Sequence, residues 1–463
     1  MNRLTWRSAA ASLVWCAGVL VSTTAQAFCG FYVGKADASL FNDASQVIMA
    51  REGNRTVISM LNDYKGDLTE FALVVPVPSV LSRDQINIGD RKVFDRLDGY
   101  SSPRLAEYHD ANPCDAGRRL EMMARSAPAP APVEAPKASA DKAFGVAVEA
   151  RYTAGEYDIV ILSAKQSDGL ETWLIQNGYR IPAGASKALG PYIKQQMKFF
   201  VAKVNLKEQK RSGNQTLRPI QFAFESEKFM LPLRLGMLNS NGPQDLIVYM
   251  LTLQGRVEST NYRTVKLPAN MDLPVFIRGE FSNFYKTFFN QQAQRENLRA
   301  VFTEYFWDMS WCDPCAANPL SEDELKSAGV FWLGADQTND SAVEPQSPQK
   351  PQRRIAPQQG ANPVMLTRLH VRYTRDSFPE DLMFQETQDR QNFQTRYVLR
   401  HPYKGPTDCE AARGYYEQVA RRQTKEAQVL ADLTGWQLSS IKQKMPAQFS
   451  SKPSNWWNAL WPR

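Results

Sequence analysis

Two cysteines spaced two residues apart are the residues best placed to do chemistry. They are Cys312 and Cys315, in the segment WCDPC that runs from Trp311 to Cys315. Such a pair closes a disulfide with little strain, and at the start of a helix the free backbone N–H groups lower the pKa of the first thiol. The spacing is therefore compatible with thiol–disulfide exchange, with a metal site, or with a structural disulfide that staples a loop.

The surroundings of this pair favour the staple. A tryptophan before the pair and a proline within it resemble the thioredoxin active-site pentapeptide, and the preceding segment 302–307 is strand-like. However, Pro319 follows only four residues after Cys315, and the next helix begins at its own capping box, Ser321 with Glu324. No alternation of strands and helices surrounds the motif. We therefore expect a structural disulfide rather than a redox centre or a metal site.

The basic start of the chain predicts export. Arg3 and Arg7 precede an apolar run of 13 residues, Ala9–Val21, and the small residues Ala25 and Ala27 follow it. This is the pattern of a cleavable signal peptide, and the run is shorter than the roughly 18 residues that a membrane-spanning helix needs. We expect cleavage after Ala27 and a mature protein in the periplasm or secreted. The bulky Phe28 argues against a lipid on Cys29.

Removal of the signal peptide leaves five cysteines in an oxidising compartment, where disulfides form. All five are disulfide candidates, and because five cannot all pair, one is left over and the connectivity stays open. They are Cys29, Cys114, Cys312, Cys315 and Cys409.

Other constellations are weaker. Glu225 and Glu227 lie two apart on an expected strand, which places them about 6.6 Å apart on one face, close to the separation in inverting glycosidases. Such pairs usually form a solvated strand face, which we favour because nothing else in the sequence supports the glycosidase interpretation. The three histidines, His109, His370 and His401, share no metal-binding spacing.

No phosphate loop, dinucleotide fingerprint or nucleophile elbow occurs, so we expect no cofactor, no metal and no hydrolase or nucleotide chemistry. The net charge of +7 falls to +5 without the two signal arginines, and no basic stripe is present, so we expect no nucleic-acid partner. The aromatic tail carries Trp456, Trp457 and Trp461. These side chains favour a membrane–water boundary, so weak peripheral contact is open, but docking back onto the domain is the favoured role.

Composition divides the chain. Ser126–Lys142 alternates Ala and Pro, and Asp336–Asn362 is rich in Gln, Pro, Asp and Ser, so both are expected to be linkers. The expected organisation is a signal peptide (1–27), an N-terminal β-rich domain (28–125), the first linker (126–142), a central β-rich α+β domain with the cysteine pair (143–335), the second linker (336–362), a strand-plus-helix segment (363–436) and a Trp-rich tail (437–463).

Hydrophobic patterning predicts mainly strands. A hairpin is expected over 46–61, with further strands over 71–75, 144–152, 157–162, 220–235, 245–253 and 366–373. Helices are expected over 90–97, 170–176 and 188–200, and a long C-terminal one over 409–434 is capped by Asp408 and stopped by Gly435. We therefore predict a β-rich α+β fold with antiparallel, sandwich-like sheets.

Six short segments fall in the order found in a bacterial family. They are Phe28–Val33 (FCGFYV), Val75–Pro78 (VPVP), Gly155–Asp158 (GEYD), Gly242–Asp245 (GPQD), the WCDPC motif and Leu369–Tyr373 (LHVRY). On these segments the chain resembles the domain of unknown function 2330 family, whose members are exported bacterial proteins without an assigned activity. The resemblance implies an envelope or secreted location and implies no reaction.

Two functional hypotheses follow. The first is a non-enzymatic interaction or structural module of the envelope or of the secreted fraction, stapled by disulfides and binding a protein or envelope partner. The second is a thiol–disulfide, redox-linked protein that works through Cys312 and Cys315.

Overall fold

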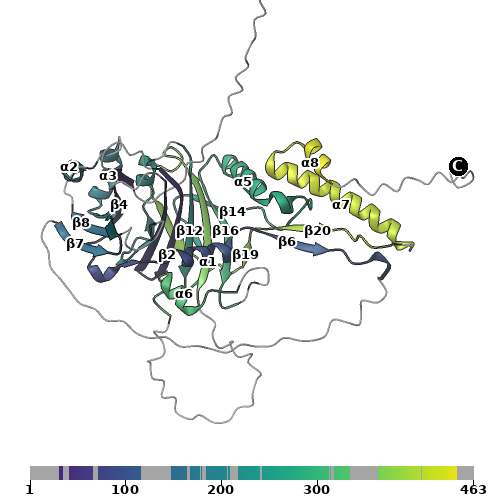
Figure 1. Ribbon diagram of the computed structural model, residues 1–463, viewed down its shortest axis with the longest axis horizontal. Helices are drawn as coiled ribbons and strands as arrows, with labels where there is room; N and C mark the ends of the chain where they lie inside the picture. Colours follow the sequence, from purple (N-terminus) through teal and green to yellow (C-terminus); the bar gives the residue numbers. More distant parts are fainter. Residues whose placement is uncertain are drawn as a thin grey trace, which may run out of the picture.

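The computed structural model describes residues 31–34, 41–65, 71–115, 148–163, 167–177, 179, 184–205, 207–208, 217–239, 242–311, 313, 318–333, 363–407 and 409–445. The expected signal peptide, Cys29, both expected linkers and the three tail tryptophans lie outside these residues. Within them the chain is mixed α+β, with four sheets and seven α-helices (Figure 1).

One sheet has five antiparallel strands. Their order is β1 (Phe31–Gly34), β4 (Phe71–Val77), β9 (Lys198–Val204), β8 (Tyr157–Ser163) and β7 (Val148–Ala154). Pro76 in β4 pairs with Phe199 of β9 but lies beyond the end of β1, whose last partner on β4 is Val74. The proline therefore lies at an edge, as its missing N–H requires.

The largest sheet has nine strands. Its order is β14 (Arg263–Lys266), β16 (Ala300–Asp308), β17 (Met365–Tyr373), β12 (Gln244–Thr252), β2 (Phe41–Glu52), β3 (Arg55–Lys65), β10 (Ile220–Glu225) and β5 (Ile86–Ile88), with β19 (Phe393–Gln394) paired to β16. The β2–β3 pair is the expected hairpin, turning at Gly53 with φ 56°.

The expectation of antiparallel sheets is wrong for this sheet. Strand β12 runs parallel to β2, and β14 runs parallel to β16. Parallel neighbours need a long crossover connection, and about 190 residues separate β2 from β12. Patterning within each strand carries no information on a neighbour so distant in the chain.

The two large sheets pack face to face. Val75, Ile159 and Phe200 of the five-stranded sheet belong to the same buried cluster as Met60 and Leu369 of the nine-stranded sheet. Alternation along β17 sends Leu369, Val371 and Tyr373 into this cluster, and Arg368, His370 and Arg372 to the opposite face. That opposite face is covered by helices.

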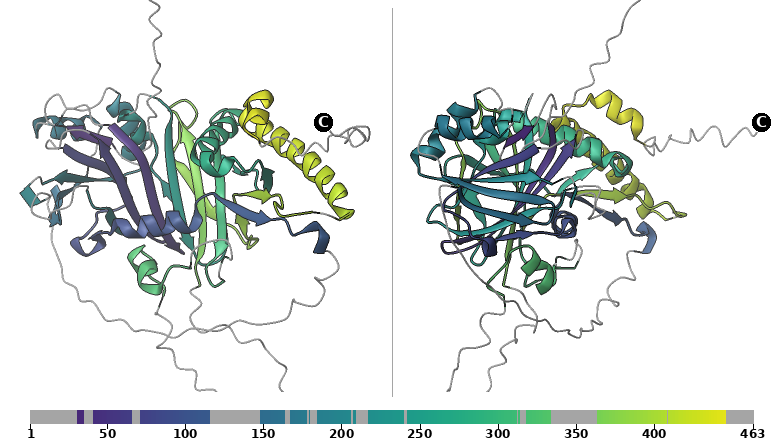
Figure 2. Two further views of the ribbon diagram at one scale, coloured as in Figure 1. Left: turned by 45° about the vertical axis from the view of Figure 1, so that its right-hand side comes forward. Right: turned by 60° about the vertical axis from the view of Figure 1, so that its left-hand side comes forward.

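The helices cover outer surfaces. α1 (Arg91–Ser101) and α6 (Glu322–Ser327) pack on one part of the nine-stranded sheet, while α5 (Ile277–Arg295), α7 (Ala411–Thr434) and α8 (Leu438–Lys444) share another core. α2 (Ser167–Gln176) and α3 (Ala185–Lys194) pack on the outside of the five-stranded sheet. Figure 2 shows α1 lying across the strands. No helix of the described residues is both long and apolar enough to span a bilayer.

Two small sheets complete the fold. The first is β11 (Met230–Leu231), β18 (Leu382–Glu386) and β13 (Val257–Ser259), and the second is the parallel set β15 (Met271–Leu273), β20 (Arg396–His401) and β6 (Arg104–His109). Strands β6 and β20 project from the body together with α7 and form what we call the arm (Figure 1).

Local signals at helix ends are confirmed. Asp90 caps α1 by accepting from the N–H of Lys92 at 2.9 Å, Ser321 and Glu324 form the expected capping box, and Gly435 ends α7 with φ 72°. α7 begins at Ala411 rather than at Cys409, and Asp408 lies outside the described residues.

Two expectations from periodicity are wrong, and one helix is missing from the predictions. The helix expected over 188–200 ends at Lys194, and the aromatic residues after it form β9. The strand pair expected over 220–235 is two short strands, β10 and β11, in different sheets, followed by a 3₁₀ turn over Arg234–Asn239. α5 was not expected at all, because its Phe, Tyr and Asn residues favour strands or turns as much as helices.

Candidate functional site

The cysteine pair of the WCDPC motif, Cys312 and Cys315, lies outside the described residues. Its described neighbours differ sharply: Trp311 is 69% exposed, whereas Asp313 is buried. The Asp313 carboxylate accepts hydrogen bonds from the hydroxyl of Tyr305, at 3.0 Å, and from the amide of Gln394. Whether the pair is a staple or a redox centre stays a prediction.

Two other candidate cysteines are brought together from distant parts of the chain. Cys114 follows β6 in the 3₁₀ turn Pro113–Asp115, Cys409 precedes α7, and the two form a disulfide across 295 residues of sequence. The bond joins the turn after β6 to the start of α7, at the tip of the arm. Below the tip, Asp110 binds the guanidinium of Arg422 of α7 at 2.8 Å and accepts from the hydroxyl of Tyr415 at 2.8 Å.

The arm also buries an acid on α7. Glu426 is 2% exposed, and its nearest cation, Arg422, is 3.4 Å away. Burial is the main cause that raises the pKa of Glu426 to about 7, and the negative charges of Asp272 and Asp110 raise it further. Together these effects outweigh the positive charge of Arg422, which lowers the pKa.

Two histidines meet in the arm. His109 and His401 face each other across β6 and β20, and their rings stack with centroids 4.4 Å apart. His401 is hydrogen-bonded through Nε2 to Glu107 at 2.7 Å. Stacked rings do not converge on a common point, and no group of three or more metal-ligating side chains occurs in the described ranges.

The third histidine belongs to a buried ionic network around Glu304. Register shifts between Thr303 and Tyr305 of β16, so Glu304 is the extra residue of a bulge and lies on the helix-covered face beside β17. Its carboxylate accepts from Nε of Arg368 at 2.6 Å and from the hydroxyl of Tyr285 on α5, and it bonds Nδ1 of His370 at 2.6 Å.

A second carboxylate extends this network. Asp245 of β12 binds Arg372 through Nε at 2.7 Å and through Nη2 at 2.5 Å. It also lies 3.4 Å from Nε2 of His370, close enough for electrostatic attraction but without hydrogen-bond geometry. The ring of His370 stacks on Phe289 of α5, with centroids 3.6 Å apart.

Contacts within the network shift the pKa values of Glu304 and His370. Burial by itself raises the pKa of Glu304, but the charges of His370 and Arg368 and the hydrogen bonds lower it to about 2. Burial lowers the pKa of His370, and Glu304 and Asp245 outweigh this, so the pKa is raised above its usual value. Cations and carboxylates thus stabilise one another inside the protein, and the raised pKa favours the protonated form of His370.

This geometry does not build a catalytic triad. In the described part of the chain the hydrogen-bond partner of the His370 ring is a carboxylate, not a hydroxyl or thiol that it would activate. The network instead joins β12, β16 and β17 to α1 and α5 through side chains that use most of their hydrogen-bonding capacity on each other. We assign it a structural role.

The paired carboxylates expected on a strand do not share a face. β10 ends at Glu225, whose side chain lies 3.9 Å from Arg55 in solvent, and the chain turns at Ser226, where the backbone bonds Asn54. Glu227 is therefore in a loop, and the expected placement of the two carboxylates on one face of a strand, as in a glycosidase, is wrong.

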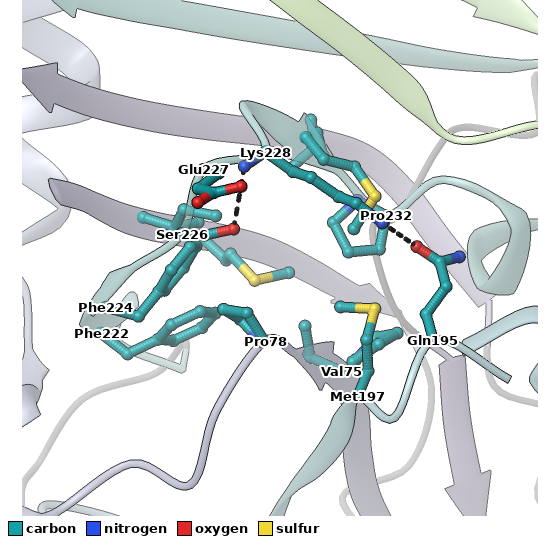
Figure 3. A pocket seen from close by; sticks show the side chains of 15 residues that line it. Val75, Pro78, Gln195, Met197, Phe222, Phe224, Ser226, Glu227, Lys228 and Pro232 are labelled. Atoms are coloured by element: carbon teal, nitrogen blue, oxygen red, sulfur yellow. Dashed lines mark hydrogen bonds between the residues drawn. The ribbon is translucent and has the colours of Figure 1, made fainter. Parts of the chain in front are cut away.

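That loop borders a cavity between the two large sheets, which we call the intersheet cavity (Figure 3). Its volume is about 260 Å³. Its wall is mainly apolar, formed by Ile58, Met60, Val75, Met197, Phe222 and Phe224 among others, and its rim carries Gln195, Ser226, Glu227 and Lys228. An apolar interior with a few polar groups at one end is the usual form of a small-molecule site.

A polar contact spans the rim. The ammonium of Lys228, in the loop after β10, donates to Oε1 of Gln195 at 2.7 Å. Gln195 is the C-terminal cap residue of α3. Arg51 fixes the same loop by donating to the carbonyl oxygens of Ser226 and Glu227 at 3.0 and 3.3 Å. The rim is thus held by β2 of the nine-stranded sheet and by the end of α3, which packs on the five-stranded sheet.

Sequence reasoning missed Glu304, Asp245 and the intersheet cavity. One signal for the network was available: Arg368, His370 and Arg372 alternate along a strand whose other residues are strongly apolar. Charges on one face of an otherwise buried strand require partners.

Removing one charged partner of the network should lower the stability of the protein. We expect Glu304→Gln to lower the free energy of unfolding by about 3–5 kcal/mol, because Arg368 and His370 lose the buried counter-charge. Urea unfolding measures this. Glu296→Gln, at a carboxylate paired with the exposed Arg263, should cost about 1 kcal/mol or less. Equal losses in the two variants would refute the assignment.

The raised pKa of Glu426 predicts a pH dependence of unusual sign. Between about pH 4.5 and 7 the unfolded chain releases this proton while the folded chain keeps it, so stability falls as the pH rises. Glu426→Gln should remove that fall and raise the free energy of unfolding at pH 8 by about 1–3 kcal/mol. Glu417→Gln on the exposed face of α7 is the control and should follow the parent protein. Parallel pH profiles for Glu426→Gln and the parent would count against this account.

Comparison with known protein families gives one match. Residues 23–385 match the model of an uncharacterized family conserved in bacteria, domain of unknown function 2330. The match includes Cys114 but ends before β19, β20, α7, α8 and Cys409. No curated protein and no solved structure matches the chain. Since the match covers most of its length, the chain belongs to the domain of unknown function 2330 family.

Proposed function

We propose that this protein is exported, by cleavage after Ala27, and works outside the cytoplasm as a non-enzymatic binding module braced by disulfide bonding. The Cys114–Cys409 bond supports the location, because disulfides persist in oxidising compartments and are rare in the cytosol. The bond ties the segment beyond the family match to the part within it.

The observation that carries the binding role is the intersheet cavity. Its side chains come from both large sheets, and it is bordered by exposed polar residues. Met60, Met197 and Met230 contribute flexible thioether side chains, which adapt their shape to an apolar group. Native cores leave few voids of this size, so a cavity open at a polar rim is best explained as a site for an apolar ligand.

The redox alternative depends on Cys312 and Cys315 alone. It predicts that changing both to Ser leaves folding nearly intact and abolishes disulfide reduction of a substrate such as insulin. The staple that we favour predicts a loss of stability instead.

The binding role is tested with naphthalene, a fluorescent apolar probe with ten carbon atoms. We expect saturable binding with one site per chain, and we expect Met197→Trp to abolish it, because the larger indole occupies the cavity. Met271→Trp, at an exposed methionine of β15 in the arm, is the matched control and should bind normally.

Melting temperatures establish that each variant is folded, and Ser226→Trp at the rim replaces Met197→Trp where the latter does not fold. Binding that does not saturate, or that persists in a folded cavity variant, would refute the role of the cavity. Peptide mapping without reductant should join the peptides of Cys114 and Cys409 in the exported protein.

A further inference from the structure

The size of the intersheet cavity limits what it accepts. A dry cavity of about 150 Å³ lined by Leu, Ile and Phe accommodates benzene, with six carbon atoms. By proportion, the 260 Å³ between Phe222, Met60 and Val75 holds about ten non-hydrogen atoms. An unbranched chain of eight to ten carbons or a fused pair of rings fills this space.

The rim supplies a cation at one side of the cavity. Lys228 is exposed, and within the described ranges its ammonium donates to the neutral amide oxygen of Gln195, not to a carboxylate. In Figure 3 the carboxylate of Glu227 lies on the side of the rim away from Gln195. A hydrogen bond to a neutral amide is weaker than one to an anion, so a ligand carboxylate has an energetic advantage over Gln195 as the partner of Lys228.

Gln195 is suited to the same anion. Its amide nitrogen donates to the carbonyl of Pro191 at a long 3.3 Å. A rotation of the Gln195 amide would present its N–H₂ group beside the ammonium. Together these groups provide donors for both oxygens of one carboxylate.

We propose that the intersheet cavity binds a medium-chain carboxylate, with its apolar chain between the sheets and its carboxylate held by Lys228 and Gln195 at the rim. This proposal rests on the proposed function, since it names the ligand class of the same cavity. The chemistry is that of a free fatty acid or of any alkyl chain with one carboxylate at its end.

The test compares three probes with the same chain length: decanoate, decan-1-ol and decylammonium. Isothermal titration at low ionic strength should give decanoate about tenfold higher affinity than decan-1-ol, and decylammonium the weakest binding. Lys228→Met should lower the affinity for decanoate about tenfold and change that for decan-1-ol less than twofold. Lys194→Met, an equal change of net charge at an exposed residue of α3 outside the cavity wall, should leave both affinities unchanged.

The outcomes separate the two levels of the proposal. Equal affinities for decanoate and decan-1-ol, unaffected by Lys228→Met, would overturn the carboxylate assignment and leave the apolar cavity standing. Absence of binding by all three probes to the folded protein would overturn the binding function itself. A loss of decanoate affinity in Lys194→Met equal to that in Lys228→Met would show a general charge effect and would also overturn the assignment.

Discussion

A buried carboxylate requires hydrogen-bond donors around it, and the donors that surround Glu304 determine which face of the nine-stranded sheet carries charged side chains. The bulge in β16 directs Glu304 toward Arg368 and His370 of β17 and toward Tyr285 of α5. These contacts place the charged residues of the central strands on one face, under the helices. The opposite face is left to apolar residues, and it packs on the five-stranded sheet. The intersheet cavity lies in this layer between the sheets, and its apolar wall comes from β3 and β10 on one side and from β4 on the other.

The arm follows a different principle. Within the described residues, the arm consists of a small parallel sheet and α7, and its apolar core is shared with α5. The Cys114–Cys409 bond and the Asp110–Arg422 pair supply what the small core does not. In a reducing compartment the arm would lose one of these two constraints, so its architecture is consistent with an oxidising compartment.

Much of the local structure could be predicted from the sequence, and the assembly could not. The hairpin at Gly53, the caps at Asp90 and Ser321 and the stop at Gly435 depend on residues a few positions apart. The parallel pairing of β12 with β2 depends on a neighbour far away in the chain. The predicted helix over 188–200 runs into the first three residues of β9, where tertiary packing overrides local propensity.

The site was harder to predict for the same reason. The five candidate cysteines were recognised, but their types and spacing do not reveal that Cys114 meets Cys409. Glu227 and Lys228 become part of a candidate site only because the loop after β10 of the nine-stranded sheet lies beside α3, which packs on the five-stranded sheet. The cavity could not be predicted, because it forms between two packed surfaces and the residue pattern along one strand does not indicate how two surfaces fit together.

Crystals soaked with 10-bromodecanoate test directly whether the space between the two sheets is a ligand site, since anomalous scattering locates the bromine atom at the end of the chain. We expect a bromine peak among Met60, Val75 and Phe222, with the carboxylate near Lys228. A bromine peak only on the protein surface, with the intersheet cavity empty at saturating ligand, would contradict it.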